Sequence, residues 1–145
     1  MRLTISVGLL AAFLFGVDLA AAAVDLETAK RIRTAKTLRE MVLILRDVER
    51  LAAAALATTD VSEAKAQRLN AEMIGSALPR IDVSNPDHRA ACMLAAFALN
   101  DVLRAAEETP ARAMVAANRS LEGWRKNIPV CERSVGIKGP RFIWE

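Results

Sequence analysis

The chain of 145 residues has few of the side chains on which catalysis and metal binding usually depend. It contains one histidine, His88, and two cysteines, Cys92 and Cys131. Acyl transfer needs a nucleophile, a base and usually an orienting acid, so a single histidine leaves the usual base scarce. The sequence also lacks G-x-S-x-G, phosphate-loop, H-E-x-x-H and C-x-x-C-H motifs. We therefore expect a non-enzymatic protein, and we assign no catalytic residue, metal ligand or cofactor.

Aromatic residues are also scarce, at 4% of the chain, and no sustained alternation of β-branched and aromatic residues occurs before the C-terminal tail. The hydrophobic fraction of 53% is too high for a disordered chain, and alanine supplies much of it. An alanine-rich, aromatic-poor composition favours closely packed helices over sheets. We therefore predict an all-α protein with a single domain.

The N-terminus has the layout of a secretory signal peptide. Arg2 precedes an apolar run from Leu3 to Val17, and small residues follow up to a cleavage position after Ala22 or Ala23. No cysteine lies near the cut and no twin-arginine pair is present, which excludes a lipoprotein anchor and twin-arginine export. We predict a periplasmic or secreted protein, with residues 1–23 a cleaved signal and 24–145 the helical domain.

The alternative is an uncleaved signal-anchor that holds the protein in the membrane. Leu3 to Val24 is just long enough to span a bilayer. Asp18 would then lie inside the span, at a cost of roughly 2–3 kcal/mol near the bilayer centre.

Helical periodicity and capping residues predict a small four-helix bundle made of two antiparallel hairpins. Asp60 and Glu63 form a capping signature, and Pro86 and Pro110 stand where a helix can begin. The expected helices are 27–57, 61–77, 86–108 and 110–128. Pro129 is expected to end the last helix, which leaves 129–145 as an irregular tail.

We expect Cys92 and Cys131 to form a disulfide, because an exported protein matures in an oxidising compartment. The two antiparallel helices that separate them have similar lengths, so the chain returns Cys131 to the level of Cys92. A bridge across about 39 residues would stabilise the fold by roughly 4 kcal/mol in the chain-entropy model. The alternative is a metal site of His88, Cys92 and Cys131, which would need reduced thiolates and lacks the paired spacing of zinc sites.

The most distinctive charged segment is "AKRIRTAKTLR", near the start of the first predicted helix. Such a cationic helix end would overhang the shorter second helix and could contact an anionic surface or an acidic partner. An ordinary solvated helix, supported by a Lys36–Glu40 pair, is the competing interpretation. The candidate partner-binding residues of this segment are Lys30, Arg31, Arg33, Lys36 and Arg39.

An apolar cluster in "RFIWE" ends the chain, with Phe142 and Trp144 as further candidate binding residues. Free termini are normally polar, so this cluster should be buried on the protein's own helices or on a partner.

These features favour an exported, non-enzymatic binding or scaffolding protein of the cell envelope that acts on a protein partner. An anionic envelope surface is a second possible target, whereas nucleic acid is not expected, because no stacking aromatics stand among the basic residues. The alternative functions are a helical bundle that binds a hydrophobic ligand or cofactor in its core, and an envelope-stress or chaperone-like protein.

Overall fold

The computed structural model describes residues 26–107 and 110–139, and the side chains of these residues except those of 110–116. A helical segment, 26–34, comes first. The remaining helices are α2 (Leu38–Ala57), α3 (Val61–Ala77), the short η1 (Leu78–Arg80), α4 (Pro86–Glu107) and α5 (Pro110–Ser134). The described residues contain no strand, so the all-α class is confirmed. The expected signal peptide and the tail residues Phe142 and Trp144 lie outside the described residues.

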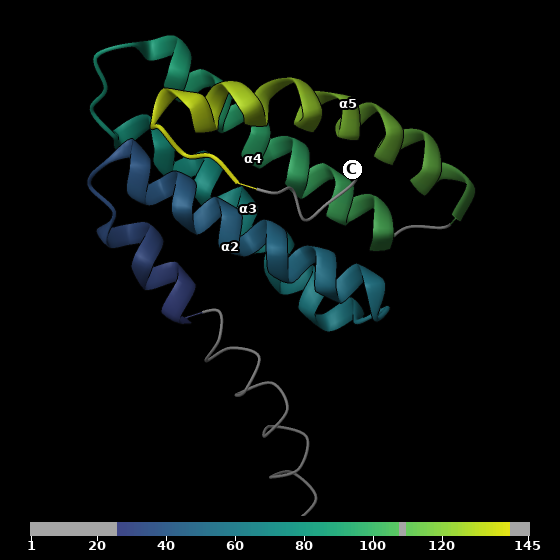
Figure 1. Ribbon diagram of the computed structural model, residues 1–145. Helices are drawn as coiled ribbons and strands as arrows, with labels where there is room; N and C mark the ends of the chain where they lie inside the picture. Colours follow the sequence, from purple (N-terminus) through teal and green to yellow (C-terminus); the bar gives the residue numbers. More distant parts are fainter. Residues whose placement is uncertain (1–25, 108–109, 140–145) are drawn as a thin grey trace, which may run out of the picture.

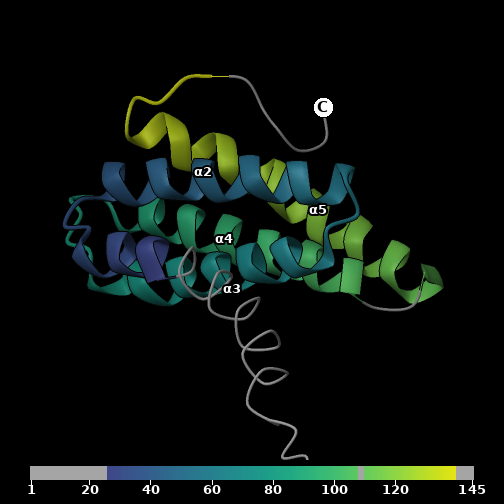
Figure 2. The same ribbon diagram turned by 90° about the horizontal axis from the view of Figure 1, so that it is seen from below.

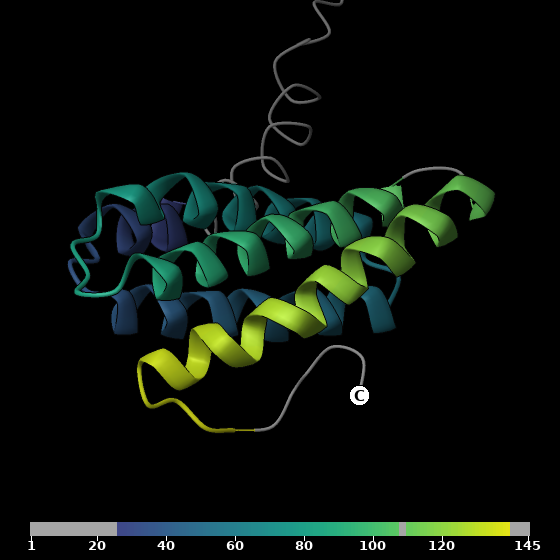
Figure 3. The same ribbon diagram turned by 90° about the horizontal axis from the view of Figure 1, so that it is seen from above.

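Successive helices pack side by side, so that α3 lies against α2, α4 against α3, and α5 against α4 (Figures 1 and 3). The α4–α5 contact is the most extensive of these. Large side chains that are fully buried come from every helix, and they include Ile32, Met41, Leu45, Ile74, Leu78, Leu99, Leu103, Trp124 and Ile128. Many of the other core positions are alanines, which let the helix backbones approach closely.

The single helix predicted over 27–57 is wrong, because the chain breaks at residues 35–37. Thr37 caps α2 with a reciprocal capping box: its hydroxyl accepts from the Glu40 N–H at 3.2 Å, and Glu40 Oε2 accepts from the Thr37 N–H at 3.0 Å. The capping residues outcompete the helix formers upstream, since they satisfy backbone donors that a new helix start leaves free.

Because of this break, segment 26–34 folds back across α2 and α3 and does not overhang them as expected (Figures 1 and 2). Ile32 is 1% exposed and joins the core. The Arg80 guanidinium donates to the Ile32 carbonyl, and Arg31 Nη2 donates to Asp47 Oδ2 at 2.8 Å. The segment is therefore held to the fold at more than one point.

The second predicted helix, 61–77, is confirmed at both ends. The Asp60 carboxylate accepts from the Glu63 N–H at 3.0 Å, as its capping position requires. The turn before it places Thr59 at φ 55°, a left-handed conformation that a β-branched residue rarely adopts.

The third helix begins at Pro86 as predicted, with Asn85 Oδ1 accepting from the Asp87 N–H. The predicted end of the last helix is wrong, because α5 continues through Pro129 to Ser134. Proline removes only one backbone donor, while Ile128 is buried on one side of it and Cys131 is tied to α4 on the other. Tertiary contacts therefore keep this last turn helical. Only residues 135–139 of the expected tail are described outside a helix.

None of the helices in the described part of the chain has the length and apolarity needed to cross a membrane.

Candidate functional site

The two cysteines lie in a disulfide, as the sequence predicts. Cys92 on α4 and Cys131 on α5 are bonded, with Cα atoms 4.8 Å apart and both side chains buried. His88, one turn before Cys92, is half-buried, and its Nε2 lies 3.3 Å from Asn85 Nδ2. Since each sulfur bonds the other, the set of His88, Cys92 and Cys131 does not serve as a metal site here. Within residues 26–107 and 110–139, no three metal-ligating side chains form a cluster.

The structure separates the five basic candidates into two groups. Arg31 and Arg39 are directed at the protein itself: Arg31 pairs with Asp47, and Arg39 Nη1 donates to the Val135 carbonyl at 2.6 Å. Lys30, Arg33 and Lys36 are exposed, and their side chains make no ion pair with the described residues. The cationic surface that remains open to a partner is therefore narrower than the sequence segment.

Glu40 does not form the expected side-chain pair with Lys36 but binds backbone donors at the helix break. Its carboxylate accepts from the Lys36 N–H at 2.7 Å and from the Thr37 N–H at 3.0 Å. These hydrogen bonds, with that of Lys36 the largest contribution, lower the pKa of Glu40 below its ordinary value. Glu40 is thus occupied with backbone donors and does not cover the exposed cations.

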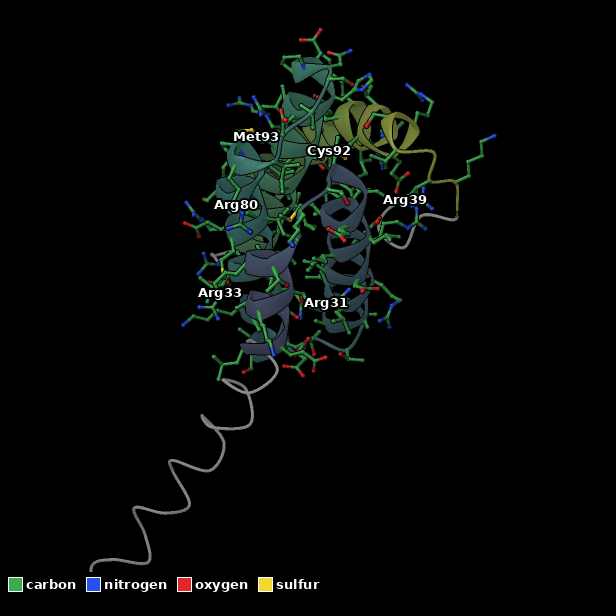
Figure 4. All side chains as sticks on the ribbon, turned by 90° about the vertical axis from the view of Figure 1, so that its left-hand side faces the viewer. Arg31, Arg33, Arg39, Arg80, Cys92 and Met93 are labelled. Carbon is green, nitrogen blue, oxygen red and sulfur yellow. A yellow bond between two sulfur atoms is a disulfide. The ribbon has the colours of Figure 1, made fainter. Side chains whose placement is uncertain are left out.

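Other cations meet the basic segment at the same end of the helices, which Figure 4 views directly. We call residues 30–40, 78–90 and 131–139 the disulfide end. They contain nine lysines and arginines against four acidic residues, a net charge of +5. We call residues 50–65 and 104–107 the opposite end, where three cations meet three acids and the net charge is zero. The disulfide end is therefore more positive than these residues of the opposite end, while α5 adds further exposed cations at Arg119, Arg125 and Lys126.

Several of these arginines also tie the disulfide end together. Arg89 Nη1 donates to the Ile81 carbonyl at 2.9 Å and to the Pro79 carbonyl at 3.4 Å, while Arg80 binds the Ile32 carbonyl. These bonds hold the α3–α4 connection and segment 26–34 in place. The sequence analysis did not predict these roles of Arg80 and Arg89, because an arginine that binds a backbone carbonyl of a neighbouring segment carries no periodic signal.

A buried ion pair links α2 to α5. Arg46 Nη1 lies 2.7 Å from Glu132 Oε1, and these side chains are only 13% and 5% exposed. Arg46 is a charged residue in the amphipathic α2, and its side chain is nevertheless mostly buried. The long stem of arginine lets its guanidinium reach a carboxylate under α5, so the position of its Cα on the helix did not reveal its burial.

Polar side chains also occupy the interior of α3, which explains its weak hydrophobic pattern. Gln67 Nε2 donates to Glu63 Oε1 at 2.8 Å, and Asn70 Nδ2 donates to Gln67 Oε1 at 3.2 Å. Gln67 and Asn70 are fully buried. These hydrogen bonds run within α3 and satisfy part of the buried amides, while Asn70 Oδ1 has no hydrogen-bond partner among the described residues.

A small pocket of about 230 Å³ opens at the opposite end, between α2, α3 and α4. Most of its lining is apolar, from Ala55, Leu56, Val61, Ala64 and Ala106, and Asp60 and Glu107 also line it. Glu107 accepts a hydrogen bond from Arg68 Nε at 2.8 Å. The pocket suits a small apolar group rather than acid–base chemistry.

No protein-family model, curated protein or solved structure matches this chain.

Proposed function

We propose that this protein is an exported, non-enzymatic binding protein of the cell envelope, built as a four-helix bundle of two antiparallel hairpins. Its disulfide end binds an acidic surface of a protein partner. The observation that carries the proposal is the net charge of +5 gathered at that end, with Lys30, Arg33 and Lys36 exposed.

The disulfide supports both export and a rigid binding surface. Disulfides persist in oxidising compartments and are rare in the cytosol. The bond joins α4 to α5 at the disulfide end. Arg39, Arg80 and Arg89 hold the neighbouring backbone through hydrogen bonds to its carbonyls. A surface that is ordered before binding loses less conformational entropy when a partner docks.

Cleavage after Ala22 or Ala23 and release into the periplasm or medium remain part of this proposal. The intact mass of the protein recovered from its native host tests it. A mass that begins at residue 23 or 24 supports export, whereas a full-length product in the membrane fraction supports the signal-anchor alternative.

The binding test compares two triple variants that remove the same amount of charge. In one, Lys30, Arg33 and Lys36 are changed to Gln; in the matched control, the exposed Arg50, Lys65 and Arg104 are changed to Gln. Partners are captured from envelope extract at low and high salt. The proposal expects a partner that is captured by the natural protein and the control, lost with the first variant, and weakened by salt.

Two results would contradict this assignment. Equal capture by both variants would remove the disulfide end as the binding surface. The other result is that no protein is captured, while the purified natural protein binds anionic lipid vesicles and the Lys30, Arg33 and Lys36 variant does not. That result would identify the envelope surface as the target.

The pocket at the opposite end supports a second candidate function, the binding of a small hydrophobic ligand. Native mass spectrometry of the protein from its host should then show added mass. Replacing Ala106 with Phe, which would fill the pocket, should remove that mass, while replacing the exposed Ala54 with Phe should not.

A further inference from the structure

One face of α4 is left uncovered by the other described segments. α4 packs against α3 and against α5 (Figure 3). On its remaining face, a stripe of exposed side chains advances by three and four residues in turn: Asp87, Ala90, Leu94, Phe97, Asp101 and Arg104. This alternation keeps side chains in line along a helix and is typical of the seam of a coiled coil.

The centre of this stripe is apolar. Leu94 is 55% exposed and Phe97 is 36% exposed. A Cβ added to Gly75 of α3 would lie 2.7 Å from the Phe97 ring, so the ring rests against the α3 backbone and is held in place before any partner binds. Adjacent exposed apolar side chains with a polar rim are typical of an interaction surface.

The stripe is complementary to itself when it is reversed. In an antiparallel pair of α4 helices centred between Leu94 and Phe97, Leu94 of each copy lies opposite Phe97 of the other. The same register places Asp87 opposite Arg104 at both ends of the seam, because these two residues are equally far from the centre. Within one copy, neither side chain forms an ion pair with the described residues. Opposite charges would therefore meet on either side of an apolar centre.

The remaining pair of the stripe and the total charge both agree with this arrangement. Ala90 lies opposite Asp101, and its small side chain lets the helices approach while Asp101 keeps its hydrogen bond from Asn100 Nδ2 at 3.3 Å. A parallel pair would instead bring the two disulfide ends together, each with a net charge of +5. The antiparallel pair keeps these ends apart, which avoids their repulsion.

We propose that α4 binds α4 of a second copy of this chain in antiparallel orientation. Leu94 and Phe97 form the centre of the contact, and ion pairs between Asp87 and Arg104 close both ends. The seam is about 25 Å long, which is small for a protein interface, so the dimer forms reversibly as concentration rises. The inference does not rest on the proposed function, because a single copy already exposes the cations of the disulfide end.

Sedimentation equilibrium of the purified, disulfide-bonded protein over a range of concentrations tests the contact. The mass should rise from one copy to two, and Leu94→Glu should hold it at one copy. The matched control is Leu43→Glu on α2, which changes a leucine that is 44% exposed and should leave dimerisation unaltered. A natural protein that stays monomeric up to about 1 mM would overturn the proposal. So would a dimer that survives Leu94→Glu or that Leu43→Glu also abolishes.

Exchange of the two charges tests the antiparallel register. Asp87→Arg alone and Arg104→Asp alone should each raise the dissociation constant roughly tenfold or more, since like charges then meet at both ends. The double exchange should restore it to within about threefold of the natural value. Residues 87 and 104 are about 25 Å apart on one helix, so they cannot contact each other within a copy and rescue requires contact between copies. Failure of the double exchange to restore dimerisation would overturn the proposal.

Discussion

The disulfide end and the opposite end of the helices are held together by different interactions. At the disulfide end, a covalent bond joins α4 to α5, and three arginines bind backbone carbonyls of neighbouring segments. At the opposite end, one ion pair joins α3 to α4, the turn at Thr59 has a left-handed backbone, and a pocket remains between the helices.

The difference shows how a small alanine-rich core can support a fixed surface. Alanine buries little area per residue, so the helices gain less from the hydrophobic effect than a leucine-rich core would give. The disulfide and the arginine–carbonyl hydrogen bonds are concentrated at the end that carries the exposed cations. The opposite end has no covalent crosslink among the described residues and contains the left-handed Thr59, and it is the place where local opening should cost least.

The largest effect should come from removing the covalent bond. Replacing both Cys92 and Cys131 with Ala should lower the free energy of unfolding by about 4 kcal/mol, since the unfolded chain regains the freedom of a 39-residue loop. Urea denaturation monitored by circular dichroism measures this. A reductant should lower the urea midpoint of the natural protein to that of the variant, and it should leave the midpoint of the variant unchanged. Equal midpoints of the two proteins without reductant would mean that the bond does not stabilise the fold.

The next effect should come from the buried ion pair. Arg46→Met should destabilise by about 3 kcal/mol, because it leaves Glu132 buried beside an apolar side chain. The matched change is Arg31→Met, whose pair with Asp47 has nearly the same distance, 2.8 Å, but is 43% and 44% exposed. This exposed pair should contribute less than about 1 kcal/mol. Equal losses in thermal denaturation would show that burial does not distinguish these two pairs.

At the opposite end, a single substitution should increase stability. Thr59→Gly should raise the free energy of unfolding by about 1 kcal/mol, because glycine adopts a φ of 55° without the steric cost that threonine has there. Thr58→Gly should instead lower it, since Thr58 has a φ of −98° and its hydroxyl donates to the Ala54 carbonyl at 2.9 Å. Chemical denaturation of both variants measures whether the free energy of unfolding rises for Thr59→Gly and falls for Thr58→Gly.

The smallest effect concerns Glu40 at the helix break. Its folded-state pKa lies below the unfolded value, so its stabilisation is present above the unfolded pKa and is lost as pH falls through the folded value. The stability difference between the natural protein and Glu40→Gln should therefore shrink as pH drops below 4.5, the ordinary value for this group. Denaturation curves across that range test this, and a difference independent of pH would contradict it.

Local rules predicted much of the fold. The bounds of α3, the start of α4 at Pro86 and the pairing of Cys92 with Cys131 each depend on a cap, a proline or a matched helix length. The break at residues 35–37 was also present in the sequence, in Thr37 and Glu40, but the helix formers on both sides concealed it. The end of the last helix was predicted wrongly at Pro129, because the contacts on either side of this proline outweigh the one hydrogen bond that it removes.

The candidate site was less accessible to sequence reasoning. The basic segment was found, but the inward roles of Arg31 and Arg39 depend on Asp47 and Val135, which come near only in the folded chain. The burial of Gln67 and Asn70 likewise interrupts the hydrophobic periodicity on which core prediction depends. Arginine side chains such as those of Arg31 and Arg39, whose partners lie in distant segments, have no signature along the chain.

The bond between Cys92 and Cys131 also closes a covalent ring that contains most of α4 and most of α5. A protease that cuts one peptide bond inside this ring adds the mass of one water but releases no fragment. A nicked molecule would therefore migrate as an intact chain on a non-reducing gel and separate into two pieces only after reduction. Limited proteolysis of this protein must be followed under both conditions, since a non-reducing gel alone would conceal every single cut between the two cysteines.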